Sequence, residues 1–173
     1  MQLLEITLIL LAGLSSVNCE RPRQLSSSSK ELMLEEGKMV PANPSCEEGW
    51  HYHNTSCYWF SSTRLDFEPA MDNCAEKGAY LTDILNQEEN TFLKDMLMVT
   101  NPKDGTDYWA GGMRNATGSQ DLHWISGAPM VFTDFYKDKG HRYIHMNFDA
   151  NFAWDTKWDM KDRDNRYICK KSV

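Results

Sequence analysis

The cysteines constrain this chain more strongly than any other feature of its sequence. Residues 6–14 form an apolar run that is too short to span a bilayer, and small and polar residues follow it up to Cys19. This is the shape of a secretory signal, and cleavage before Glu20 would remove the first of five cysteines. An even number of cysteines in an oxidising compartment predicts two disulfides, although four cysteines allow three connectivities. The four that would remain are Cys46, Cys57, Cys74 and Cys169.

Three segments are expected along the chain. An uncleaved anchor is the alternative to a signal peptide over residues 1–19, but no second apolar run follows, so we expect a secreted, extracellular protein without a membrane span. Residues 20–45 contain a serine run and several prolines, a composition that predicts a flexible polar linker. Residues 46–173 are expected to form one domain. They hold 14 Lys and Arg against 20 Asp and Glu, which argues against nucleic acid or an anionic membrane surface as a partner.

The apolar pattern within residues 46–173 predicts two helices followed by short strands. Asp66 can cap a first helix that ends at Gly78 and carries Cys74 on its inner face. A second helix is expected to open at Asn86, where Glu89 three residues later completes a capping box. This helix is predicted to bury Phe92, Leu93, Met96 and Leu97. The later strands are expected at residues 108–112, 122–125, 143–148, 152–155 and 166–170, so the fold class is α+β.

Several motifs in a fixed order carry a resemblance to a known family. They are residues 46–50 (CEEGW), 57–60 (CYWF), 78–81 (GAYL), 108–112 (YWAGG), 124–129 (WISGAP) and 167–170 (YICK). Together they resemble the C-type lectin-like domains across essentially all of residues 46–173. The resemblance implies two helices with short antiparallel strands, and it implies that Cys46 pairs with Cys57 and Cys74 with Cys169. The second bridge would tie the N- and C-terminal parts of the domain together.

The sequence departs from this family in its third disulfide and its long loop. Both cysteines of the usual third bridge are absent: Tyr143 stands at one position, and the other falls near Trp158 or Asp159. The loop that precedes the first of these positions is short, and residues 135–142 lack the proline triplet through which sugar-binding members hold calcium. We therefore expect a recognition domain without the usual calcium-bridged sugar site.

The candidate metal ligands are few. Asp138 lies between two lysines, and residues 154–156 read Trp-Asp-Thr where the family has Trp-Asn-Asp, which leaves Asp155 as the one assigned metal residue. Because calcium takes about six to eight oxygen ligands, no cofactor is certain and calcium stays a candidate only. A second way to gather a cation would be a cluster near the end of the chain, formed by Asp149, Asn151, Asp155, Asp159, Asp162 and Asp164. Solvated turns are the more ordinary interpretation of such a cluster.

Candidate ligand-binding residues are drawn from the same part of the chain. They are Phe135, Tyr136, Asn151, Trp154 and Asp155. The aromatic residues Tyr136, Phe148, Phe152, Trp154 and Trp158 would form an exposed platform for sugar rings or a protein, or alternatively fill the core. His141 and His145 make half a zinc site at most and are expected to be ordinary surface or core histidines.

Two N-glycosylation sequons begin at Asn54 and Asn115, both in predicted turns. The sequence offers no nucleophile elbow, metal triad or framed carboxylate pair, so we do not expect an enzyme. The leading hypothesis is a secreted C-type lectin-like module that binds glycan or protein ligands. The alternatives are a structural protein of the extracellular or biomineral matrix, similar to the perlucin group of this family, and a calcium-dependent carbohydrate-binding lectin.

Overall fold

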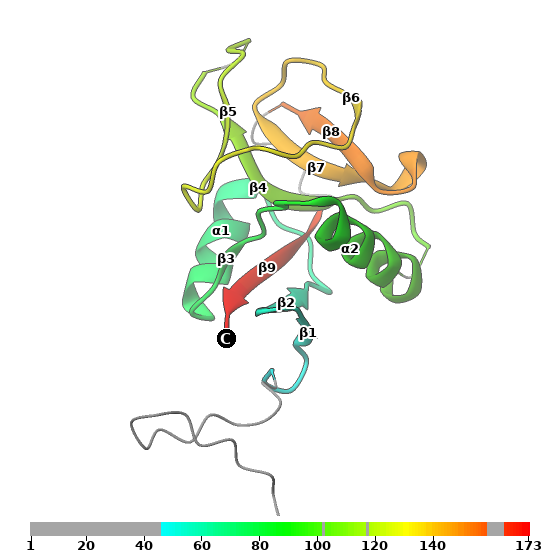
Figure 1. Ribbon diagram of the computed structural model, residues 1–173. Helices are drawn as coiled ribbons and strands as arrows, with labels where there is room; N and C mark the ends of the chain where they lie inside the picture. Colours follow the sequence, from blue (N-terminus) through cyan, green and yellow to red (C-terminus); the bar gives the residue numbers. More distant parts are fainter. Residues whose placement is uncertain (1–45, 102, 117, 159–164) are drawn as a thin grey trace, which may run out of the picture. The chain divides into compact units, whose positions relative to one another are not determined.

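The computed structural model describes residues 46–101, 103–116, 118–158 and 165–173, and the structural statements below concern these residues. The predicted signal peptide at residues 1–19 and the predicted linker at residues 20–45 lie outside them. The described residues form two α-helices, one short 3₁₀-helix and nine strands (Figure 1).

An N-terminal hairpin begins the domain. Its strands are β1, His51–His53, and β2, Ser56–Phe60, which pair antiparallel. Asn54 in the turn adopts a left-handed conformation with φ of 53°, which asparagine tolerates better than most residues. A disulfide joins Cys46 to Cys57 and thereby confirms the first pairing that the family resemblance implies.

Helix α1, Phe67–Glu76, begins and ends where the sequence indicates. Asp66 is the N-cap residue, as expected, but its side chain makes no capping hydrogen bond. Its carbonyl oxygen accepts from the Ala70 N–H and so opens the helix. Gly78 follows the helix with φ of 65°, a left-handed conformation that glycine adopts without strain. The buried residues of the helix are Phe67, Ala70 and Cys74. Cys74 is bonded to Cys169, which confirms the second implied disulfide.

Helix α2, Gln87–Thr100, is capped by Asn86, whose side-chain oxygen accepts from the Glu89 N–H at 2.9 Å. The predicted capping box is only half formed, because the Glu89 carboxylate turns inward and accepts from the Leu85 N–H at 2.8 Å. The predicted apolar face is divided between fully buried Leu93 and Leu97 and half-buried Phe92 and Met96.

The strands form one mixed sheet. Their bounds are β3 (Tyr80–Leu81), β4 (Tyr108–Arg114), β5 (Leu122–Trp124), β6 (Phe135–Lys137), β7 (Tyr143–Asn147), β8 (Ala153–Lys157) and β9 (Arg166–Ser172). The strand order is β1-β2-β9-β4-β7-β8-β6, while β3 also pairs with β9 and β5 with β4. Most ladders are antiparallel as expected, but β4 runs parallel to β9 and β6 parallel to β8. The 3₁₀-helix η1, Phe148–Ala150, connects β7 to β8, and β9 lies between α1 and α2 (Figure 1).

Strand β4 approaches its neighbours very closely. A Cβ atom on Gly111 would lie 2.3 Å from the carbonyl oxygen of Leu81 in β3. A Cβ atom on Gly112 would lie 2.4 Å from Cδ1 of Ile144 in β7. The two glycines therefore permit β4 to pack between these strands, because any side chain would collide with a neighbour.

Aromatic packing occupies the position where the family resemblance places a cysteine of the third disulfide. Tyr143 is buried, and its ring stacks on Phe67 with the centroids 4.1 Å apart and meets Trp109 edge-on at 6.3 Å. Such pairs contribute about 0.5–1.5 kcal/mol beyond the burial of their area. The start of β7 is thus fixed by packing instead of by a covalent bond.

A buried ion cluster connects α2 with β9. Lys170 Nζ donates to Asp83 Oδ1 at 2.6 Å and to Glu89 Oε1 at 2.5 Å, and all three side chains are less than a tenth exposed. Tyr58 donates its hydroxyl to the same Glu89 carboxylate at 2.6 Å. Burial and the neighbouring Glu89 carboxylate raise the pKa of Tyr58 far above its usual value, so the phenol stays protonated and continues to donate.

Candidate ligand-binding face

Strands β6 and β8 lie side by side at the edge of the sheet and carry most of the predicted ligand residues. They run parallel, with Phe135 opposite Trp154 and Lys137 opposite Asp155. Side chains alternate along β6, so the Phe135 ring meets Trp154 edge-on at 5.5 Å while Tyr136 is 70% exposed. The strand itself was not predicted, because a three-residue strand has almost no periodic signal and this one depends on its partner β8.

Trp154 is completely buried, so its assignment as a ligand contact is wrong. Its ring packs edge-on against Trp124 at 5.4 Å and Phe132 at 5.7 Å. Its indole N–H donates to Asn90 Oδ1 in α2 at 3.0 Å. These contacts show that Trp154 points into the core and not toward a ligand.

Asp155 is also buried, and both of its carboxylate oxygens are engaged. Lys139 Nζ donates to Oδ2 at 2.5 Å, and the Thr156 N–H donates to Oδ1 at 2.7 Å. The Asp155 side chain is 2% exposed, whereas that of Lys139 is 38% exposed. A cation at Asp155 would have to displace the ammonium group of Lys139. No local sequence pattern indicates this contact, because the two residues lie 16 positions apart.

The second carboxylate of this region is neutralised in the same way. Asp138 pairs with the buried guanidinium of Arg114, and its Oδ1 accepts from the Gly140 N–H at 2.9 Å. Burial alone would raise the pKa of Asp138, but the Gly140 N–H and the Arg114 guanidinium outweigh it and hold the pKa below its usual value. Asp138 and Asp155 therefore both have cationic partners, which a calcium ion bound at this edge of the sheet would have to displace.

Thr156 connects its strand, β8, to the loop that contains Asp138. Its hydroxyl oxygen accepts from the N–H groups of Lys139 at 3.1 Å and His141 at 3.2 Å. A His141 ring nitrogen lies 2.8 Å from the Thr156 carbonyl oxygen, and the His141 ring is 4.5 Å from that of Trp158. Trp158 is 56% exposed. We refer to the exposed or half-exposed side chains of Tyr136, Lys137, His141 and Trp158 as the β6–β8 face.

The remaining candidates lie at the turn between β7 and β8. Phe152 is buried and Phe148 half-buried, so the structure does not join the five predicted aromatic residues into one platform. Asn151 is exposed and adopts a left-handed conformation with φ of 52°. Asp159, Asp162 and Asp164 lie outside the described residues. Among those that are described, no three His, Cys, Asp or Glu side chains are placed to hold a metal ion.

His145 and His53 are held by contacts with neighbouring side chains. His145 is buried and lies 3.2 Å from the Asp107 carboxylate, which also accepts from Lys157 at 2.8 Å. Burial of Asp107 would raise its pKa, but these two partners lower the pKa to about 2, and burial lowers the pKa of His145. His53 stacks on Phe92 with the ring centroids 4.2 Å apart.

Both sequon asparagines are at the surface. Asn54 is exposed in the turn of the N-terminal hairpin. Asn115 is exposed after β4, and its amide donates to Asp121 at 2.7 Å.

Two helices, a mixed sheet and two disulfides, one of which joins α1 to the last strand, define a C-type lectin-like fold. Residues 63–171 match the family described as Lectin C-type domain. The chain belongs to this family. Proteins with this fold are recognition proteins. None of the helices in the described part of the chain is both long and apolar enough to cross a membrane.

Comparison with individual proteins places the chain among diverse members of the family. A perlucin-like protein of Mytilus galloprovincialis is 28% identical over 122 residues, which cover 65% of this chain and 76% of that protein. The calcium-independent C-type lectin SPL-2 from Saxidomus purpuratus has a TM-score of 0.65 at 23% identity, with 73% of this chain and 93% of that chain covered. A calcium-dependent type II antifreeze protein in its calcium-free form has a TM-score of 0.61 at 27% identity, with 73% and 100% covered. Both calcium-dependent and calcium-independent proteins therefore share this fold.

Proposed function

We propose that this protein is a secreted C-type lectin-like recognition module that binds a glycan or protein ligand without a calcium bridge. The observation that carries the proposal is the Lys139 ammonium group, which lies 2.5 Å from the Asp155 carboxylate. Arg114 neutralises Asp138 in the same region. Since a calcium-bridged sugar needs free carboxylate and carbonyl oxygens at one point, these two ion pairs oppose that mode of binding.

The β6–β8 face is the proposed contact surface. Tyr136 and Trp158 are large, exposed aromatic side chains, and such residues dominate the energy of many recognition surfaces because they bury much apolar area at a small entropy cost. Lys137, the next residue of the edge strand, is also exposed. SPL-2, which has the same fold, is described as a calcium-independent lectin, and this description supports the proposal.

The decisive experiment is a binding screen of the purified secreted protein on glycan and extracellular-protein arrays, in calcium and in EDTA. We expect the same ligand signals in both buffers, and we expect Tyr136→Ala and Trp158→Ala to remove them. Tyr52→Ala is the matched control, since Tyr52 is an exposed tyrosine in β1, outside the β6–β8 face. Ligand binding that is lost in EDTA would contradict the proposal.

Calorimetric titration separates the remaining alternatives. We expect no saturable calcium site tighter than about millimolar affinity. A micromolar calcium site that Asp155→Ala abolishes would restore the calcium-dependent lectin. Binding to calcium carbonate particles, with no soluble ligand on either array, would instead favour the matrix role.

Secretion and glycosylation belong to the same proposal. We infer that the protein is secreted after cleavage before Glu20, carries glycans at Asn54 and Asn115, and acts by recognition without catalysis. Intact mass before and after glycosidase treatment should show a chain that starts at Glu20 and loses two glycans. A chain that retains Cys19 and shows no mass change on treatment would contradict both inferences.

A further inference from the structure

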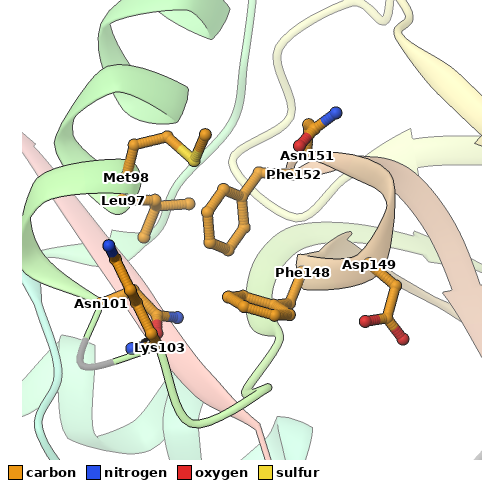
Figure 2. Close-up of a pocket in the computed structure, with 8 residues that line it drawn as sticks. All are labelled: Leu97, Met98, Asn101, Lys103, Phe148, Asp149, Asn151 and Phe152. Carbon is orange, nitrogen blue, oxygen red and sulfur yellow. Dashed lines mark hydrogen bonds between the residues drawn. The ribbon is translucent and has the colours of Figure 1, made fainter.

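A pocket of about 360 Å³ opens between the end of α2 and the η1 turn (Figure 2). This volume is at the lower end of the range for small-molecule sites, which is about 300–1,000 Å³. Its apolar lining consists of Leu97 and Met98 from α2 and Phe148 and Phe152 from the turn. Leu97 and Phe152 are buried, whereas Met98 is 56% exposed and gives the pocket an apolar rim. The polar residues that line it are Asn101, Lys103, Asp149 and Asn151.

The turn side of the pocket is preformed. Phe152 has φ of 58°, a left-handed conformation that a bulky residue adopts only where the surrounding structure holds it. The conformation is held by a hydrogen bond from the Phe152 N–H to the Asn147 carbonyl oxygen at 2.7 Å. The Phe152 ring meets Tyr108 edge-on at 6.2 Å and Phe148 at 5.8 Å. In Figure 2 the rings of Phe148 and Phe152 both point into the pocket, and the Phe152 ring faces Leu97.

One cation lines the pocket on the side of α2, namely Lys103, which follows the helix. The Asn101 side chain, which is buried, accepts from the Lys103 N–H at 2.7 Å and donates to the Thr106 carbonyl oxygen at 3.1 Å. These bonds fix the backbone of Lys103 beside the pocket. No carboxylate in the described part of the chain forms an ion pair with Lys103. Asp149 also lines the pocket, but Figure 2 shows its carboxylate directed away from the two phenyl rings.

We propose that this pocket binds a small anionic amphiphile, namely an aliphatic or aromatic carboxylate. Its apolar part packs against Phe148, Phe152 and Met98, and its carboxylate faces the Lys103 ammonium group. Lys103 is the one cation of the lining and selects this charge, because an ammonium group beside it would be repelled, while the carboxylate of Asp149, the one anion of the lining, is directed away from the two rings. The pocket lies on α2 and η1, so the proposal is independent of ligand binding at the β6–β8 face.

The test uses sodium octanoate and octylammonium chloride as probes of equal chain length and opposite charge, with the whole secreted protein. Calorimetry should show that octanoate binds about five- to tenfold more tightly than octylammonium. Lys103→Glu should reverse this preference, and Lys103→Gln should abolish it. Lys137→Glu is the matched control, because it makes the same charge change at an exposed lysine of β6 and should leave octanoate affinity unchanged.

Two-dimensional NMR locates the bound probe. Octanoate should shift the Met98 methyl and Phe152 amide signals, with little change at Tyr136 and Trp158. Equal affinities for the two probes, or shifts confined to other surfaces, would overturn the proposal. So would a loss of octanoate affinity in Lys137→Glu as large as in Lys103→Glu. Melting temperatures of the variants verify that each one is folded before its affinity is interpreted.

Discussion

Replacement of Lys139 by glutamine should destabilise the domain, because it leaves the buried carboxylate of Asp155 without its cation. Asp155 Oδ2 would lose a hydrogen bond of 2.5 Å, while Oδ1 would keep the Thr156 N–H at 2.7 Å. Hydrogen bonds to charged groups contribute about 1.5–3 kcal/mol when they are buried. Since the Lys139 side chain is 38% exposed, solvent screens the pair, and we expect a loss of about 1–2 kcal/mol.

A double-mutant cycle isolates this interaction. Asp155→Asn removes the charge, and Lys139→Gln in that background should cost less than about 0.5 kcal/mol, which gives a coupling energy of about 0.5–2 kcal/mol. Urea unfolding at pH 7, followed by tryptophan fluorescence, measures all four proteins. Lys137→Gln, an exposed neighbour in β6, should change the free energy of unfolding by no more than about 0.5 kcal/mol. Additive effects of the two substitutions would refute the argument that Lys139 neutralises Asp155.

The other predictions concern the rest of the domain. Double replacement of Cys74 and Cys169 by alanine should cost about 4–5 kcal/mol in urea unfolding, because the bridge spans 95 residues; a loss below 1 kcal/mol would contradict this. Gly111→Ala should lower stability by about 1–3 kcal/mol in thermal melts, since its Cβ would lie 2.3 Å from a carbonyl oxygen, and an unchanged melting temperature would disprove the clash. Burial lowers the pKa of His145, so the unfolded chain binds more protons and the free energy of unfolding should fall below about pH 6.5. His145→Gln should reduce this slope in urea titrations across pH, and exposed His51→Gln should not.

Residues close together in the chain were sufficient to predict the helices. Asn86 caps α2 and Gly78 follows α1 as expected, because caps and turns depend on bonds within a few residues. The number of disulfides followed from the cysteine count, but their connectivity required the family resemblance. Strand β6 was missed, because three residues carry little periodicity and the pairing partner lies in β8.

The sequence also located the acidic and aromatic residues of the site, but only the tertiary structure decided what each one does. Trp154 and Trp158 are four positions apart, yet one is completely buried beneath the sheet edge and the other is 56% exposed. Asp155 was a candidate metal ligand until the fold brought Lys139 to its carboxylate. Burial and ion pairing depend on contacts between distant segments, and local sequence patterns contain no information about which segments meet. For the same reason, the pocket between α2 and η1 had no signal in the sequence.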